Sequence, residues 1–83
     1  MAHVWELQGA SKTYYPNGNV KSEENYFLGE RNGVCKYYHS NGKLKEEANF
    51  KLDERYGETK YYDTTGKLIR TEVYHNDKLI EVK

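Results

Sequence analysis

The 83-residue sequence lacks a surplus of either charge, because its 13 lysines and arginines balance its 13 aspartates and glutamates. The two signs alternate along the chain and do not collect into blocks. Nucleic acids and anionic membrane surfaces bind proteins that present a field of positive sign. We therefore expect no nucleic-acid partner.

Long apolar runs are also missing. No window approaches the roughly 18 consecutive apolar residues of a membrane-spanning helix, so we predict no membrane span. The first residues, through Trp5 and Leu7, do not combine a basic segment with a following apolar stretch, as a secretory signal would. We expect a cytoplasmic protein, although a mature secreted protein expressed from an internal start would have the same sequence.

Cysteine and histidine are scarce. A single cysteine, Cys35, forbids an internal disulfide. The three histidines, His3, His39 and His75, are isolated, and none has a second ligand at the spacing of a metal site. A nucleophilic Cys35 would need a histidine base in hydrogen-bond reach, but His39 lies about 13 Å farther along an extended strand. We expect no metal and no cofactor.

Candidate catalytic carboxylates occur as neighbours in the chain, at Glu23-Glu24 and Glu46-Glu47. Adjacent residues of a strand point to opposite faces, so neither pair converges on one bond. The 24-residue spacing of the glycines predicts an open sheet of one layer, and such a sheet offers no water-excluding cleft in which to raise a carboxyl pKa. We therefore predict that the chain is not an enzyme.

Aliphatic side chains are few as well. Apolar residues make up 36% of the chain, and nine of its twelve aromatic residues are tyrosine. A chain of this length buries only about 60% of its unfolded surface on folding. The core should be thin and should depend on amphipathic rings.

The sequence does contain a 24-residue repeat. The turn glycines Gly18, Gly42 and Gly66 have this spacing, and so do Gly9, Gly33 and Gly57, Lys12, Lys36 and Lys60, and Tyr26, Phe50 and Tyr74. A fixed period of this length indicates stacked supersecondary units. We place repeats at about 9–32, 33–56 and 57–80 of a domain at 11–83. Residues 1–10, with Val4, Trp5 and Leu7, are expected to be an N-terminal cap or a leader.

Each repeat reads as a β-hairpin, because tyrosine, phenylalanine, valine and threonine cluster in short runs broken by Asn-Gly or Thr-Gly. Pro16 and Thr65 fit poorly in a two-residue type I′ loop. A type I turn followed by a left-handed glycine accommodates all three sequences. Short connections then give an all-β fold, a single-layer twisted antiparallel meander of about six to seven strands. We expect strands near 11–15, 19–27, 34–39, 43–51, 58–63, 67–75 and 78–82.

Counting outward from the turns gives a predicted register in which Tyr38 opposes Leu44, Lys36 opposes Glu46 and Val34 lies near Ala48. The predicted core face then carries Tyr14, Val20, Tyr26, Val34, Tyr38, Leu44, Phe50, Tyr62, Leu68 and Tyr74. On the other face, rings among charges suit a binding surface, since rigid rings with a polar tip are typical of interfaces. The candidate contacts are Tyr15, Tyr37, Tyr61, Lys45 and Glu47. The alternative is that these rings only stabilise the sheet by packing across strands.

The pattern Gly-x-x-Lys-Tyr-Tyr-x-x-Asn-Gly-Lys-Leu, followed by Glu and then by Tyr or Phe, resembles the MORN repeat. It is most similar to the variant class that occurs in tandem in bacterial proteins, and the resemblance covers about residues 9–80. The resemblance implies a sheet built from hairpins. Members often carry a tryptophan two residues after the repeat glycine, where this chain has Ser11, Cys35 and Thr59.

Many bacterial members resemble antitoxin or immunity components of toxin systems. The resemblance therefore implies a non-enzymatic module that binds another protein and occludes a toxin. Two alternatives remain open at this point: a structural scaffold that forms a homodimer through sheet faces or edges, and a ring-lined surface that binds carbohydrate.

Overall fold

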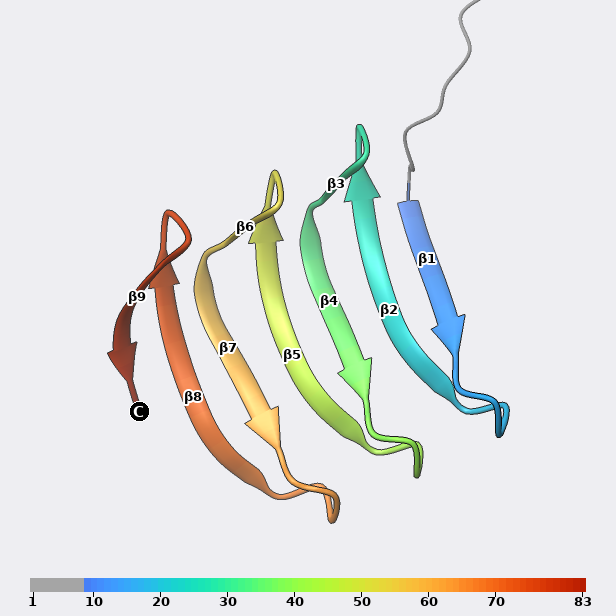
Figure 1. Ribbon diagram of the computed structural model, residues 1–83. Helices are drawn as coiled ribbons and strands as arrows, with labels where there is room; N and C mark the ends of the chain where they lie inside the picture. The colour runs from blue at the N-terminus through green and yellow to red at the C-terminus, as the bar shows by residue number, and fades with distance from the viewer. Residues whose placement is uncertain (1–8) are drawn as a thin grey trace, which may run out of the picture.

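The structure, a computed structural model, describes residues 9–83, and these form one antiparallel sheet (Figure 1). The order along the sheet is β1-β2-β4-β5-β7-β8-β9. The two short strands lie off this path: β3 pairs with β2, and β6 pairs with β5. The strands are β1 Gly9–Tyr14, β2 Val20–Phe27, β3 Glu30–Arg31, β4 Gly33–Tyr38, β5 Leu44–Lys51, β6 Glu54–Arg55, β7 Gly57–Tyr62, β8 Leu68–His75 and β9 Lys78–Val82. The predicted antiparallel meander is confirmed, and the count of nine arises because β3 and β6 are separate two-residue ladders.

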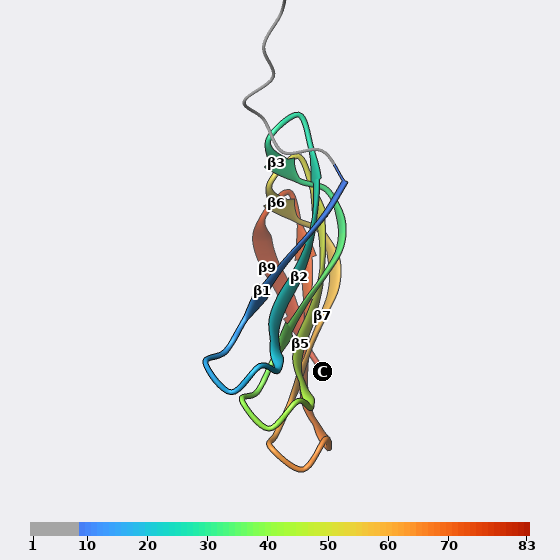
Figure 2. The same ribbon diagram turned by 90° about the vertical axis from the view of Figure 1, so that its right-hand side faces the viewer.

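The sheet is a single twisted layer, which is plain when it is viewed edge-on (Figure 2). Its Cα atoms span 48 × 36 × 12 Å. β1 and β9 form the two edges. The expected N-terminal cap at residues 1–10 falls mostly on residues 1–8, which lie outside the described residues.

At one end of the sheet, each hairpin turns through the predicted three-residue loop. In the first repeat the amide of Gly18 donates to the carbonyl of Tyr15 (2.9 Å), and the amide of Tyr15 donates to the carbonyl of Asn19 (2.8 Å). Gly18, Gly42 and Gly66 have φ of 93°, 92° and 95°, in the region that favours glycine. The loop therefore tolerates proline at Pro16 and needs no positive φ at Thr65.

At the other end, the connections are two-residue loops with positive φ at both central positions, as in type I′ turns. Leu28 (52°) precedes Gly29, Leu52 (49°) precedes Asp53, and the third loop contains Asn76 and Asp77. Leucine is an unfavourable residue in this conformation, and yet it occupies it in two of the three loops.

Besides the left-handed glycine of its turn, every hairpin has a second bulge, one extra residue just after the first pair of facing residues. This second bulge makes the predicted register wrong beyond that pair. Tyr38 does oppose Leu44, but Lys45 is then left without a partner, so that Tyr37 opposes Glu46 and Lys36 opposes Glu47. The same extra residue occurs after the first pair in the other two hairpins. Because one extra residue exchanges the faces of all residues beyond it, the predicted core combined side chains from both faces.

Within residues 9–83 the buried apolar residues are Cys35, Ala48 and Phe50, and half-buried Tyr37 packs against them. We call the side of the sheet that carries them the core face. Tyr26 and Tyr74 lie on this face with Phe50, because they occupy the same position in their repeats. The core thus depends on small side chains around one ring.

The remaining predicted core residues lie on the opposite face, and for these the prediction is wrong. They are Tyr14, Val20, Val34, Tyr38, Leu44, Tyr62 and Leu68. Tyr14 is 59% exposed and Leu68 is 47% exposed. Tyr37, which was predicted to face away from the core, packs against it instead.

Hydrogen bonds join each repeat to the next at both ends of the sheet. The Asn17 side-chain amide donates to the carbonyl of Ser40, and the Asn41 amide donates to that of Thr64, both at 2.8 Å. At the type I′ end, the amide of Asp53 donates to the carbonyl of Arg31 (2.8 Å). Neighbouring repeats therefore stack through their turns as well as through the strand ladders.

Candidate functional site

A row of rings and guanidinium groups crosses the core face. The short strands β3 and β6 follow the type I′ turns and place Arg31 opposite Tyr26 and Arg55 opposite Phe50. The guanidinium carbon of Arg31 lies 4.2 Å from the centroid of the Phe50 ring, and that of Arg55 lies 5.2 Å from it. Arg55 is also 5.6 Å from the centroid of the Tyr74 ring. Rings and guanidinium groups therefore alternate across the three repeats, and those at Phe50 and Tyr74 make cation–π contacts.

Carboxylates on the same face hold the tyrosine hydroxyl groups. Glu24 accepts hydrogen bonds from the hydroxyls of Tyr26 (2.8 Å) and Tyr37 (2.5 Å). In the third repeat, Glu72 accepts one from Tyr74 (2.9 Å). The repeats vary in a coordinated way here, because Tyr26 and Tyr74 follow a glutamate by two residues, whereas Phe50, which has no hydroxyl, follows Ala48. Each ring therefore has the partner that its chemistry requires.

Ion pairs complete this face. Arg55 lies 2.9 Å from Glu46, Arg31 donates to Asp53 at 2.6 Å, and Arg70 pairs with Glu72. The buried Glu46 Oε2 makes no hydrogen bond of good geometry, but its 2.9 Å contact with the Arg55 guanidinium is an ion pair, and that contact compensates its charge. Each of these three arginines is thus paired with a carboxylate, while Glu24 is held by the hydroxyls of Tyr26 and Tyr37.

Burial and these partners shift the pKa of several groups. Burial alone would raise the pKa of Glu72, but hydrogen bonds from Tyr74 and Tyr61, together with the charge and hydrogen bond of Arg70, outweigh it and lower that pKa. Burial, reinforced by the charge of Glu46, raises the pKa of Tyr61 to about 12. Burial and the hydrogen bond to Glu24 also raise the pKa of Tyr37. At neutral pH these rings are uncharged hydrogen-bond donors and the carboxylate is ionised, an arrangement suited to recognition and not to proton transfer.

The opposite face carries a row of alternating charges. Register places Lys12 opposite Glu23, Glu23 opposite Lys36, Lys36 opposite Glu47, and Glu47 opposite Lys60. Opposite charges in directly facing positions stabilise a sheet. The Lys12 amine lies 3.3 Å from a Glu23 carboxylate oxygen, and the Tyr38 hydroxyl donates to the other oxygen at 2.6 Å. The hydrogen bond from Tyr38 is the main reason that the pKa of Glu23 is lowered.

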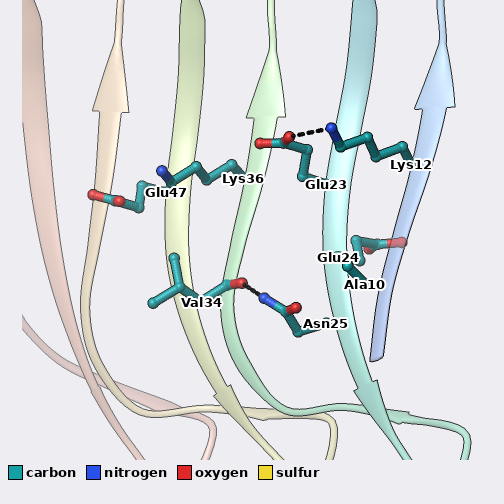
Figure 3. Close-up of a pocket in the computed structure, with 8 residues that line it drawn as sticks. All are labelled: Ala10, Lys12, Glu23, Glu24, Asn25, Val34, Lys36 and Glu47. Carbon is teal, nitrogen blue, oxygen red and sulfur yellow. Dashed lines mark hydrogen bonds and ion pairs between the residues drawn. The ribbon is translucent and has the colours of Figure 1, made fainter. Parts of the chain in front are cut away.

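A shallow groove of about 420 Å³ lies over this row, between β1 and β5 (Figure 3). Lys12, Glu23, Lys36 and Glu47 line it together with the apolar Val34. The charged side chains already face partners across the strands, and the groove is open to solvent. It therefore excludes no water, as a catalytic cleft would need to do.

The structure does not bring the five predicted contact residues together. Tyr37 and Tyr61 lie on the core face, whereas Glu47 belongs to the charge row on the opposite face. Lys45 is the exposed bulge residue. Tyr15 is half-buried beside the glycine turn, where its hydroxyl donates to the carbonyl of Tyr38 (2.6 Å). Tyr37 and Tyr61 remain candidates for a common surface.

Sequence reasoning missed the guanidinium groups of Arg31 and Arg55, and with them Glu24. The two arginines are 24 residues apart and each follows a type I′ loop, so the repeat itself contained the signal. The correct register would have placed each beside a ring, but that register depends on the second bulge.

No group of three or more histidine, cysteine, aspartate or glutamate side chains that could hold a metal ion occurs among residues 9–83. Over the same residues, no helix is long and apolar enough to cross a membrane.

A scan against protein-family models matches the MORN repeat variant at residues 7–27, 31–52 and 55–80. Comparisons with curated proteins and with solved structures gave no match. Repeats of this family are non-catalytic modules that generally bind proteins or membranes. The three matched segments follow the three hairpins of the sheet, and the chain therefore belongs to the family of the MORN repeat variant.

Proposed function

We propose that the chain is a non-enzymatic module that binds another protein through its core face. The observation that supports this most is the row of rings and guanidinium groups. Tyrosine and arginine are the residue types enriched at the energetic centres of protein interfaces. Tyr37, Tyr61 and Arg55 are half-buried, so each still presents a surface to a partner.

The core face is also ordered before any partner arrives. The hydroxyl of Tyr37 is fixed by Glu24, and the guanidinium of Arg55 is fixed by Glu46 and by the Phe50 ring. A surface whose side chains are already held loses little conformational entropy on binding. The matched charges favour a protein partner over an anionic membrane, which selects for excess positive charge.

A carbohydrate ligand fits this face less well, because sugars stack on uncovered ring faces. Arg31 and Arg55 already lie over the Phe50 ring. The geometry of the row thus disfavours the carbohydrate alternative.

For the partner, we propose a toxic protein that this chain occludes, in the manner of an antitoxin or immunity protein. This part is supported by the family resemblance alone. The test is to express the open reading frame beside this gene, in the source genome, alone and together with this chain. We expect the neighbour to arrest growth and the chain to restore it.

A matched pair of variants separates the two faces. Arg70→Ala removes an exposed cation of the core face, and Lys60→Ala removes a half-buried cation from the charge row on the opposite face. Both variants should keep the β-sheet circular dichroism spectrum, while only Arg70→Ala should weaken the rescue of growth. A neighbour that is harmless, or whose toxicity the chain does not change, would refute the toxin proposal. Equal loss in the two variants would refute the assignment of the binding face.

A further inference from the structure

We infer that the free edge of β9 accepts an extended segment of a partner protein as the next strand of the sheet, and that this segment carries a carboxylate three residues before an aromatic ring. The inference uses a different surface from the core-face proposal and shares with it only the idea that the partner is a protein. Four features of the edge carry it.

The first feature is the charge row of the opposite face. Lysine and glutamate alternate from Lys12 to Lys60, after which Thr71 takes the position of a glutamate. The next strand, β9, continues the row with Lys83, whose amide donates to the carbonyl of Thr71 (2.7 Å). Earlier in the row, each lysine faces a glutamate on the next strand: Lys12 faces Glu23, and Lys36 faces Glu47. A carboxylate is therefore the side chain that continues the row beyond Lys83.

Lys83 reaches this row because β9 departs from the 24-residue period. Arg31 faces Tyr26 and Lys36 faces Glu23, so the segment from Arg31 to Lys36 is two residues longer than the segment of β2 that it faces. This bulge contains Gly33 at φ 97°. Glu81 stands at the glycine position in β9, and there the bulge has only one extra residue. The shorter bulge brings Lys83 into line with Lys60, one residue earlier than the period would.

The second feature is the row of rings and cations on the core face. It runs from Tyr26 to Tyr74 and ends at Leu79, which opposes Tyr74 and occupies the position of Arg31 and Arg55 in its repeat. The group that follows each such position in the earlier repeats is an aromatic ring. An apolar ring is the natural neighbour of Leu79, since leucine offers it a hydrophobic contact and no charge.

The third feature is the backbone. The carbonyls of Arg31 and Arg55 accept the amides of Asp53 (2.8 Å) and Asp77 (2.9 Å), which lie in the turn that follows the neighbouring strand. Leu79 is the equivalent residue of β9, and among residues 9–83 no further hairpin follows it. Its carbonyl is therefore placed to accept an amide that lies just beyond the ring of an added segment, which pairs along the edge as in β-strand addition.

The fourth feature is exposure, and it distinguishes β9 from the other edge. Leu79, Ile80 and Val82 are 48%, 63% and 53% exposed. β1, at the opposite edge, has only Tyr14 as a large apolar side chain. An exposed apolar edge strand is a template for pairing with another chain. The amine of Lys83 already forms an ion pair with Glu58 (2.8 Å). A carboxylate from an added segment would therefore share this amine with Glu58.

The chain itself supplies the spacing of the incoming segment. In the second hairpin, Glu47 lies opposite Lys36 and Phe50 lies opposite Gly33, so that the carboxylate precedes the ring by three residues on an antiparallel strand. A segment of the form Glu-x-x-Phe or Glu-x-x-Tyr would place its carboxylate beside Lys83 and its ring near Leu79. The probe for the test is therefore a synthetic peptide with the sequence of residues 43–51.

The experiment titrates this peptide into the isotope-labelled full chain and follows the backbone amide signals by nuclear magnetic resonance. We expect saturable shifts that are largest at residues 78–83. A control peptide with lysine in place of the glutamate at the position of Glu47 should bind at least about tenfold more weakly, because it sets like charges together. A second control peptide with serine at the ring position should also bind more weakly.

Protein variants locate the site. Leu79→Lys places a charge on the β9 edge and should abolish the shifts, whereas Ala10→Lys at the β1 edge should leave them unchanged. No binding, equal binding of the lysine peptide, or shifts centred on β1 would each overturn the inference. So would a dimer, detected by sedimentation and abolished by Leu79→Lys, that excludes the peptide, because a second copy of the chain would then be the occupant. The peptide titration reports on β9 alone, so a negative result would leave the core-face proposal intact. The growth assay, in turn, tests the core-face proposal and does not test binding at β9.

Discussion

Phe50→Leu should test whether the guanidinium groups, and not apolar burial alone, hold the core face together. Phe50 is 2% exposed and lies between Arg31 and Arg55. Leucine stays buried and apolar, so the loss of transfer free energy should be below about 1 kcal/mol. It has no ring, so both cation–π contacts disappear, at about 1 kcal/mol each for partly desolvated pairs. We therefore expect a total loss of about 2–3 kcal/mol.

This loss is large for so small a domain. At about 0.05–0.15 kcal/mol per residue, a chain of 83 residues has a free energy of unfolding of roughly 4–12 kcal/mol. Urea unfolding followed by far-ultraviolet circular dichroism should show the midpoint fall by about 2–3 M, for a slope near 1 kcal/mol per molar. The melting temperature should fall by about 10–20 °C.

A double-mutant cycle isolates the ring–cation term. Arg31→Met replaces the aliphatic stem with an unbranched apolar side chain and removes the charge, and the cycle with Phe50→Leu should give a coupling free energy of about 1 kcal/mol. Arg31 also pairs with Asp53, and the cycle subtracts that contribution because it is absent from both variants that lack Arg31. Coupling indistinguishable from zero, or a loss below about 0.5 kcal/mol in Phe50→Leu, would refute the reasoning.

Four further predictions follow from the register, the turns and the half-buried tyrosines. Tyr37→Ala should cost about 2–4 kcal/mol in urea unfolding, clearly more than Tyr38→Ala, because only Tyr37 packs against the core; the reverse order would contradict the observed faces. Leu52→Asn should raise the melting temperature by a few degrees, about 4–8 °C per kcal/mol, by relieving strain at φ 49°. Gly42→Ala should lower it, through strain at φ 92° and not through a clash, since the nearest atom would lie 3.7 Å away. Burial raises the pKa of Tyr38 and of Tyr61 from 10.0 to about 12, so stability should be complete below pH 10 and fall as pH rises toward 12. Tyrosinate absorbance with urea unfolding at each pH measures this, and flat stability over that range would contradict it.

The repeat period, the turn type and the strand positions were all predictable from the sequence. Each depends on local chemistry: glycine at fixed spacing, a proline-tolerant loop, and short runs of ring and β-branched residues. Predicted strands such as 19–27 and 43–51 differ from β2 and β5 by one residue at one end. The 24-residue spacing also gave the family resemblance, because three units agree in phase.

The faces were not predicted correctly, because nothing local marks the second bulge. Its extra residues are Lys21, Lys45 and Ile69, which share no chemistry that demands a bulge. A global criterion could have found it. Only the bulged register sets Lys36 against Glu47 and brings Cys35 beside Ala48, which joins the lysines into one alternating row and the small side chains into one core. Register is determined by consistency across the whole sheet.

The candidate site therefore follows from a structure that has few apolar residues to bury. With only Cys35, Ala48 and Phe50 as its buried apolar residues among the described ones, the sheet depends on partners that cross from one repeat to the next. Arg31 contacts the ring of the following repeat, and Asn17 donates to the following turn. These same contacts order the side chains of an open surface, and they recur only where a next repeat exists. Among residues 9–83 these contacts stop at β9, and the contacts that the earlier repeats make with a following strand are the ones an added strand would supply there.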